Sequence, residues 1–139
     1  MIQRTDEVRI QSQGQGLVDF TRQVGELVAA SRVRQGLCTV FVRHTSASLI
    51  IQENADPSVC RDLEHYLNKL VPENDPDYTH TMEGPDDMPA HIKGALTATS
   101  LGIPVMDGRL ALGTWQGIYL WEHRRHRSDR RVVVNVIGE

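Results

Sequence analysis

Three histidines have the residue type and setting for a metal site. His44 ends an apolar stretch and opens the run His-Thr-Ser-Ala-Ser, His80 lies in a long acidic segment, and His91 follows that segment. Three neutral imidazoles with one open position are a familiar catalytic metal arrangement. Their spacings of 36 and 11 residues match no short zinc signature. The alternative is that each histidine caps a helix or fills a satisfied polar niche.

A second group of polar residues follows the apolar run that ends near residue 53. Glu53, Asn54 and Asp56 stand directly before Pro57. Acids and an amide at a strand-to-helix turn can bind a divalent cation or orient a histidine that binds one. The simpler interpretation is that Asp56 caps a helix whose first residue is Pro57.

Three further segments have a chemical and a structural interpretation. Asp86 and Asp87 could act on a cation or cap the helix that follows them. Trp115 stands between two glycines, so it could pack against a ligand or a second subunit, or lie in the core. The arginine-rich run 124–127 could hold phosphate groups, although such runs are more often solvated hairpin tips.

Composition and charge exclude several classes of protein. The chain has 139 residues, 40% of them apolar, and a net charge of −3, which fits one folded domain and not a disordered chain. It is too short for a (β/α)₈ barrel, and no apolar run is long enough to span a membrane. Residues 1–10 show no signal peptide and two cysteines make no disulfide framework, so we expect a cytoplasmic location.

The charge is unevenly distributed along the chain. Residues 52–87 hold ten acids and two bases. An acidic segment of this kind argues against a nucleic-acid surface, which needs basic residues. The chain also lacks the glycine-rich GxxxxGK[ST] and GxGxxG phosphate loops and the GxSxG nucleophile motif.

Hydrophobic periodicity predicts an α+β fold with mostly antiparallel strands. Helices are predicted at 17–31, 57–71 and 88–99, and strands at 4–12, 37–43, 48–53, 103–106, 109–112, 116–122 and 131–137. We expect strands 37–43 and 48–53 to pair, and residues 123–130 to be the turn between the last two strands. The Asp107-Gly108 pair predicts a tight type I′ turn.

Four blocks of the sequence resemble the YjbQ-like family, nearly from end to end. They are residues 44–56 (HTSASLIIQENAD), 83–93 (EGPDDMPAHIK), 100–108 (SLGIPVMDG) and 112–117 (LGTWQG). Members of that family are described as secondary thiamine-phosphate synthase enzymes. The resemblance implies one domain over residues 1–139, a two-sheet β-sandwich with flanking helices, and assembly as a homotrimer.

The resemblance also implies a site. His44, His80 and His91 would line a metal or anion site. Zinc is one candidate for a divalent metal there, because three imidazoles bind zinc, iron or nickel, and magnesium is an option for a diphosphate. As a working hypothesis, Glu53, Asn54 and Asp56 carry or position acid–base chemistry. The residues assigned to substrate binding are Thr45, Ser46, Asp87, Thr114 and Gln116.

The implied reaction joins a pyrimidine diphosphate to a thiazole phosphate and releases pyrophosphate. Two other functions remain open at this point. One is a metal-dependent hydrolase of a small phosphorylated or ester metabolite, in which activated water is the nucleophile. The other is a non-catalytic trimeric binding module. For the synthase and for the hydrolase, the expected partner is a small phosphorylated metabolite, and neither nucleic acid nor a membrane is involved.

Overall fold

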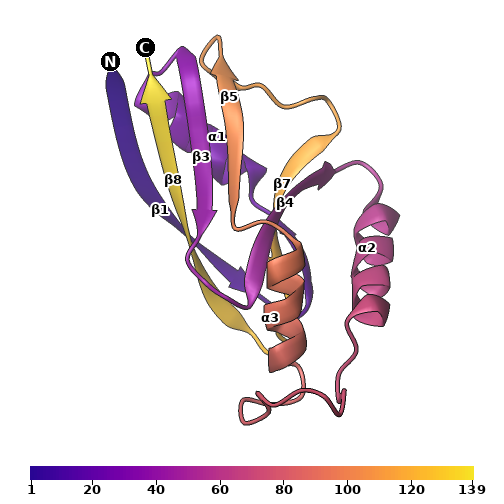
Figure 1. Cartoon of the computed structure of the whole chain (residues 1–139). Coiled ribbons are helices and arrows are strands. Elements are labelled where there is room, and N and C mark those ends of the chain that lie inside the picture. The colour runs from indigo at the N-terminus through magenta and orange to yellow at the C-terminus, as the bar shows by residue number, and fades with distance from the viewer.

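A computed structural model describes all residues from 1 to 139 and shows two antiparallel sheets with three helices (Figure 1). The helices are α1 (Thr21–Ser31), α2 (Pro57–Leu70) and α3 (Asp87–Leu96). The strands are β1 (Ile2–Ser12), β2 (Gly16–Asp19), β3 (Gln35–Val42), β4 (Ala47–Glu53), β5 (Ser100–Met106), β6 (Arg109–Leu110), β7 (Gln116–Glu122) and β8 (Ser128–Gly138).

The two sheets differ in size and in strand order. The larger sheet has the order β1-β8-β3-β5-β6, and the smaller has the order β2-β7-β4. β1 pairs with β8 along its whole length, from Ile2 opposite Gly138 to Ser12 opposite Ser128. The two ends of the described chain therefore lie side by side (Figure 1).

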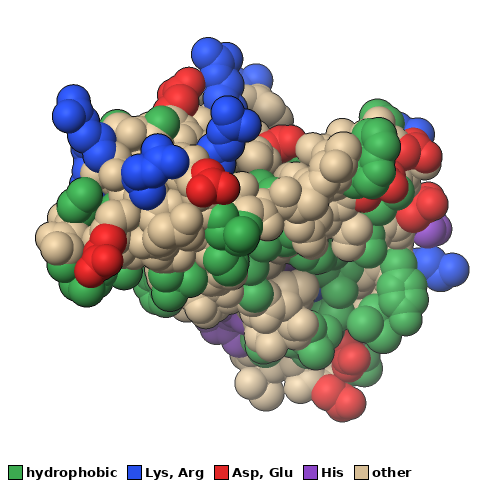
Figure 2. Space-filling model, turned by 90° about the horizontal axis from the view of Figure 1, so that it is seen from above, with side chains coloured by type: hydrophobic (Ala, Val, Ile, Leu, Met, Phe, Trp, Pro, Cys, Tyr) green, Lys and Arg blue, Asp and Glu red, His purple; other side chains and the backbone are tan.

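One face of the larger sheet has no helix on it. α1 lies behind this sheet in Figure 1, so the near face is open. Its exposed apolar side chains include Leu37, Phe41 and Met106, with exposed fractions of 44%, 46% and 56%. Figure 2 views the molecule from above and shows apolar side chains along the lower edge, where this open face lies.

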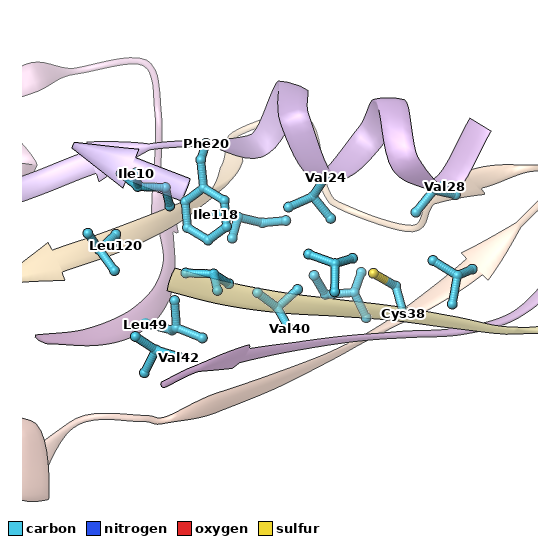
Figure 3. Close-up of a cluster of buried hydrophobic side chains, with 14 of the residues drawn as sticks. Ile10, Phe20, Val24, Val28, Cys38, Val40, Val42, Leu49, Ile118 and Leu120 are labelled. Atoms are coloured by element: carbon cyan, nitrogen blue, oxygen red, sulfur yellow. The ribbon is translucent and has the colours of Figure 1, made fainter. Parts of the chain in front are cut away.

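The core fills the space between the two sheets and α1. Alternate residues of β3, such as Cys38 and Val40, point inward because successive strand side chains face opposite sides. Val24 and Val28 of α1 pack against them, and Phe20 fills the end of the core nearer the smaller sheet (Figure 3). At about 1.5–3 kcal/mol for each fully buried side chain, this cluster dominates the folding energy.

Two local predictions are confirmed at the level of backbone geometry. Asp56 is the N-cap of α2, and its side chain accepts a hydrogen bond from the Ser58 amide, with Pro57 in the first turn. Asp107 and Gly108 have φ of 51° and 78°, the left-handed values that a type I′ turn requires.

The prediction of one helix over residues 17–31 is wrong in its first part. Residues 16–19 form β2, which pairs with β7, and the helix begins only at Thr21. The apolar residues at 17 and 20 fit a helical period, but they also fit a short strand followed by a helix. The partner strand lies about a hundred residues away in sequence, which local periodicity cannot detect.

The predicted strand pairings at residues 37–53 and 116–137 are also wrong. β3 pairs with β5 and β8, whereas β4 pairs with β7 in the other sheet. β7 and β8 likewise belong to different sheets. Both short connections therefore carry the chain from one layer of the sandwich to the other. The turn after β3 carries His44, so the change of layer positions this histidine at an edge between the sheets.

None of the three helices is long and apolar enough to cross a membrane.

Candidate metal centre

The start of α3 places two of the candidate side chains on one face. Asp87 and His91 are four residues apart, and residues at this spacing are neighbours on a helix surface. His80 reaches them from the loop that leads into α3. Since Pro72 and the polar residues after it end α2, the loop is free to fold back over the first turn of α3.

Asp87 lies at the centre of the cluster. Its Oδ2 is 2.7 Å from Nε2 of His80 and 3.1 Å from Nε2 of His91. One ligand atom from each of the three residues lies within 4.8 Å of the other two. The two imidazole rings meet edge to face, with centroids 5.3 Å apart. Two imidazole nitrogens and one carboxylate oxygen thus converge on one small volume.

The hydrogen bonding of His91 tests whether this cluster fits a cation. Its Nδ1 lies 3.2 Å from the carbonyl oxygen of Thr45, which can only accept, so Nδ1 carries a proton. Nε2 faces the Asp87 carboxylate at 3.1 Å, and in the neutral ring this nitrogen would offer its lone pair to a cation placed between them. A ring held by a carbonyl at one nitrogen with the other directed at the site is the usual arrangement of a metal-binding histidine. The donor set therefore fits a divalent cation.

The charges around Asp87 keep it ionised. Its side chain is only 6% exposed, and this burial raises the pKa of the carboxyl group. The hydrogen bond from His80 and the charge of Arg124 outweigh that effect, so the pKa lies below its ordinary value. Arg124 Nη1 donates to the second carboxylate oxygen at 2.8 Å. Asp87 is therefore oriented on one side by an arginine and directed to both histidines on the other.

The arginine-rich run after β7 is not simply a solvated tip. Arg124 Nε donates to Asp86 at 2.9 Å, and the backbone amide of Arg125 donates to the same carboxylate oxygen. Arg125 also pairs with Glu73 at 2.6 Å. Asp86 is the N-cap residue of α3 but makes no side-chain cap bond, because its carboxylate is used by these arginines. The run thus holds the loop and α3 together.

His44 lies beside this cluster but outside it. Its Nε2 accepts a hydrogen bond from the backbone amide of Arg131 at 2.8 Å. Burial lowers the pKa of His44, and the charge of Arg130 lowers it further. A cavity of about 330 Å³ has both His44 and His91 in its wall, together with Thr45, Ala47, Gly94, Ala95 and Thr99.

A buried ion pair supports the turn that carries His44 and Thr45. Glu122 is fully buried, and its carboxylate accepts hydrogen bonds from Arg130, from the Ser12 hydroxyl at 2.6 Å and from the Arg124 amide at 3.1 Å. Arg130 Nη2 also donates to the carbonyl and the hydroxyl of Ser46 at 3.2 and 3.0 Å. Arg130 therefore holds Ser46 in the turn after β3. Glu122 is bonded both to Arg130, which supports this turn, and to the amide of Arg124, whose side chain orients Asp87.

Sequence reasoning missed Glu122, Arg130 and two further buried residues, His123 and Lys93. His123 accepts from or donates to the Ser48 hydroxyl at 2.8 Å through Nε2, and its Nδ1 has no hydrogen-bond partner. Lys93 donates to Asn68. One signal in the sequence was available: Glu122 directly follows four consecutive apolar residues of a strand, and a charged residue that is buried with such a strand needs a partner.

The remaining candidate residues lie at the opposite end of the smaller sheet. Glu53 ends β4, and Gln116 begins β7 beside it in the register. Asn54 Nδ2 approaches the Gln116 carbonyl at 3.5 Å, Gln116 accepts from the Gly113 amide, and Glu53 accepts from the Asp56 amide. Thr114 is exposed. β4 has seven residues, so this group is about 20 Å from the His44 turn. The structure does not bring the two groups together within one chain.

The fold and the cluster together define a small α+β sandwich protein with a His–Asp–His cluster at the start of its third helix. The chain belongs to the YjbQ-like family, because the family model described as "UPF0047 protein YjbQ-like" matches residues 6–139.

Relatives and solved structures agree with this assignment. The chain is 58% identical to the UPF0047 protein sll1880 of Synechocystis over 94% of this chain and 88% of that protein. It is 47% identical to YjbQ of Escherichia coli O157:H7 over 84% and 83%. A crystal structure of an uncharacterized conserved protein of the yjbq/upf0047 family from Clostridium acetobutylicum superposes with a TM-score of 0.88, at 40% identity over 95% and 99% of the two chains. The hypothetical protein APE1520 from Aeropyrum pernix gives 0.89 at 28% identity, over 98% and 99%.

Proposed function

We propose that this protein is an enzyme that holds a divalent cation between His80, Asp87 and His91 and acts on a small phosphorylated molecule. The observation that carries this proposal is the convergence of two imidazole nitrogens and one carboxylate oxygen within 4.8 Å. Two imidazoles favour zinc or a similar transition metal over magnesium, which prefers oxygen ligands. Magnesium would enter with a diphosphate substrate.

The chain's own residues supply binding and orientation. Thr45 fixes the ring of His91 through its carbonyl oxygen, and Arg124 fixes the carboxylate of Asp87. The cavity lined by His44, His91 and Thr99 adjoins the cluster and has room for a small ligand group. A bound divalent cation would neutralise negative charge on phosphate oxygens, including a leaving group.

The finer activity within this proposal follows from the family resemblance. The candidate reaction is thiamine-phosphate synthesis, in which the bond between carbon and the diphosphate oxygen of the pyrimidine breaks, pyrophosphate leaves, and the ring nitrogen of the thiazole phosphate forms a bond to that carbon. Hydrolysis of a phosphorylated or ester metabolite, with water as nucleophile, is the competing outcome. A product assay with both substrates, with and without a chelator, separates the two reactions.

We also propose that three copies of the chain assemble through the open face of the larger sheet, as the resemblance implies. The exposed side chains of Leu37, Phe41 and Met106 support this proposal. Apolar side chains gathered on one face of a monomer commonly mark a protein–protein contact.

The metal site is tested by replacing Asp87 with asparagine, which keeps the shape and removes the charge. We expect zinc affinity, measured by competition with a chromogenic chelator, to fall by more than about tenfold. The matched control is Asp77→Asn, an exposed acid of the same loop, which should bind zinc as the wild type does. Equal zinc affinity in the wild type, Asp77→Asn and Asp87→Asn would refute the site.

A further inference from the structure

His44 has a fixed tautomer in this fold. The backbone amide of Arg131 approaches its Nε2 at 2.8 Å, and a backbone amide can only donate a hydrogen bond. Nε2 must therefore present its lone pair to that amide. A protonated imidazolium would instead set one N–H against another. The neutral ring then carries its single proton on Nδ1.

This tautomer determines what His44 can do in the cavity beside the cluster. A nitrogen that carries a proton donates a hydrogen bond and cannot bind a cation until it loses that proton. Nδ1 has no hydrogen-bond partner within the chain, because the only bond of the ring is made through Nε2. The ring nevertheless forms part of the cavity wall that also contains His91. A ring with a free N–H donor thus forms part of the wall of the cavity that adjoins the proposed cation site.

The electrostatic setting selects the kind of acceptor. The guanidinium groups of Arg130, Arg131 and Arg43 all act on the His44 ring through their charges. Acids are present as well, since Glu122 pairs with Arg130, and Glu7 pairs with Arg43 at 3.1 Å. A positively biased rim and an N–H donor suit a negatively charged oxygen better than a neutral group or a second cation.

We propose that His44 is not a metal ligand but donates a hydrogen bond from Nδ1 to an anionic oxygen of the ligand. That oxygen belongs to a phosphate or carboxylate group held against the cation of the His80–Asp87–His91 cluster. This inference rests on the proposed function and adds to it the role of His44 and the charge of the group it recognises. The Arg131 amide is then the positioning group that fixes the tautomer.

The tautomer can be measured directly on the wild-type protein. Long-range ¹H–¹⁵N correlation spectra of the histidine rings distinguish a protonated from an unprotonated nitrogen. We expect His44 to show its proton on Nδ1 at neutral pH, with and without zinc. A proton on Nε2, or zinc bound to the His44 ring, overturns the inference.

Two substitutions separate the two nitrogens. In His44→Gln the side-chain oxygen can still accept from the Arg131 amide, but no donor remains at the Nδ1 position. In His44→Asn the side-chain amide keeps a donor near Nδ1. We expect both variants to bind zinc as the wild type does. Affinity for methylphosphonate, followed by NMR titration, should fall about tenfold or more in His44→Gln and less in His44→Asn.

The outcomes distinguish this inference from the proposed function. Loss of zinc in His44→Gln to the extent seen in Asp87→Asn makes His44 a ligand and overturns the inference alone. Unchanged methylphosphonate affinity in His44→Gln also overturns it, as does failure of the wild type to bind methylphosphonate or acetate. Tighter binding of acetate than of methylphosphonate assigns the oxygen to a carboxylate. A wild type that binds no zinc overturns the proposed metal site, while the spectra and the anion titration still decide the role of His44.

Discussion

Two neighbouring residues at the end of β7 are buried with opposite preferences for charge. Glu122 stays ionised: burial raises its pKa, but the bonds from Arg130 and Ser12 outweigh this and leave it below the ordinary value. His123 has no ionised partner of that kind. Burial, assisted by the charge of Lys93, lowers the pKa of His123 to about 3. The folded protein therefore keeps a carboxylate and a neutral imidazole side by side.

His123 should make the protein less stable as the pH falls below 6.5. The unfolded chain takes up a proton at the ordinary pKa of 6.5, whereas the folded protein resists protonation down to about 3. The contribution of neutral His123 to the free energy of unfolding is complete above pH 6.5. Below that pH it falls by up to about 1.4 kcal/mol per pH unit. The free energy of unfolding should therefore change less with pH in His123→Gln than in the wild type. Urea titrations at pH 6.5, 5.5 and 4.5 measure this slope.

A control for this prediction is available on α2. His65 is exposed, so His65→Gln should leave the wild-type slope unchanged. The loss of stability from Glu122 belongs to a lower pH range, because its depressed pKa places protonation below 4.5. Equal slopes in His123→Gln and the wild type would show that the buried ring accepts its proton without cost.

At this scale the sequence pointed to part of the candidate site. His80, His91 and Asp87 could be named because their types suit a cation and they stand in or beside one polar segment. Their distances could not be derived, since they depend on how a loop folds back over α3. Arg130 could not be found either. Its partner Glu122 and the Ser46 turn meet it only when two sheets pack together.

Among the elements, α3 and the turn after β3 approach each other unusually closely. A Cβ atom at Gly94 would lie 3.2 Å from the carbonyl oxygen of Thr45. That carbonyl is the one that orients His91. The absence of a side chain at position 94 thus lets the helix that carries Asp87 and His91 lie against the turn that carries His44.

Gly94→Ala should weaken zinc binding without weakening the helix. Alanine favours a helix over glycine by about 1 kcal/mol, but its Cβ would press on Thr45 and shift the carbonyl from His91. We expect zinc affinity to fall roughly tenfold, as for loss of a group that orients a ligand. Chelator competition measures this affinity, and thermal unfolding checks that the fold persists.

Gly25→Ala in α1 is the matched control. Nothing lies within 4 Å of the position that its Cβ would take, so the substitution should stabilise the protein by about 0.5–1 kcal/mol and leave zinc affinity unchanged. Unaltered zinc affinity in Gly94→Ala would mean that the Thr45 carbonyl does not control the orientation of His91.

Element types were more predictable than element partners. The cap at Asp56 and the Asp107-Gly108 turn have local physical signatures, so the sequence indicates them directly. β2 lacks such a signature, because four residues become a strand only through pairing with β7. The short connection 43–46 similarly resembles a hairpin turn, whereas β4 pairs in the other sheet with β7, which is buried on both faces.

On the scale of the whole molecule, the open sheet face and the candidate site share one border. Arg131 donates its amide to His44, and its side chain faces Glu7 at 4.0 Å on the face that carries Phe41. A neighbouring copy on that face would therefore approach Arg131, whose amide holds the His44 ring.

A charge placed on the open face should disrupt the proposed trimer. Phe41→Glu puts a carboxylate where apolar contact is expected, and burying an unpaired charge is costly. We expect light scattering to report a threefold lower mass than for the wild type. Tyr66→Glu, at an exposed aromatic residue of α2 away from this face, should keep the wild-type mass. A monomeric wild type at micromolar concentration would refute the assembly.

The position of β8 has a consequence for how the protein is made. β8 is the last strand in the sequence, yet it lies inside the larger sheet, between β1 and β3. Until β8 has been synthesised, no strand can lie between β1 and β3. The residues of β1 can pair only with residues more than a hundred positions later in the chain. Such long-range pairing slows folding and exposes strand edges in the meantime. Completion of the larger sheet, and with it the support of the Ser46 turn by Arg130, therefore follows the synthesis of β8.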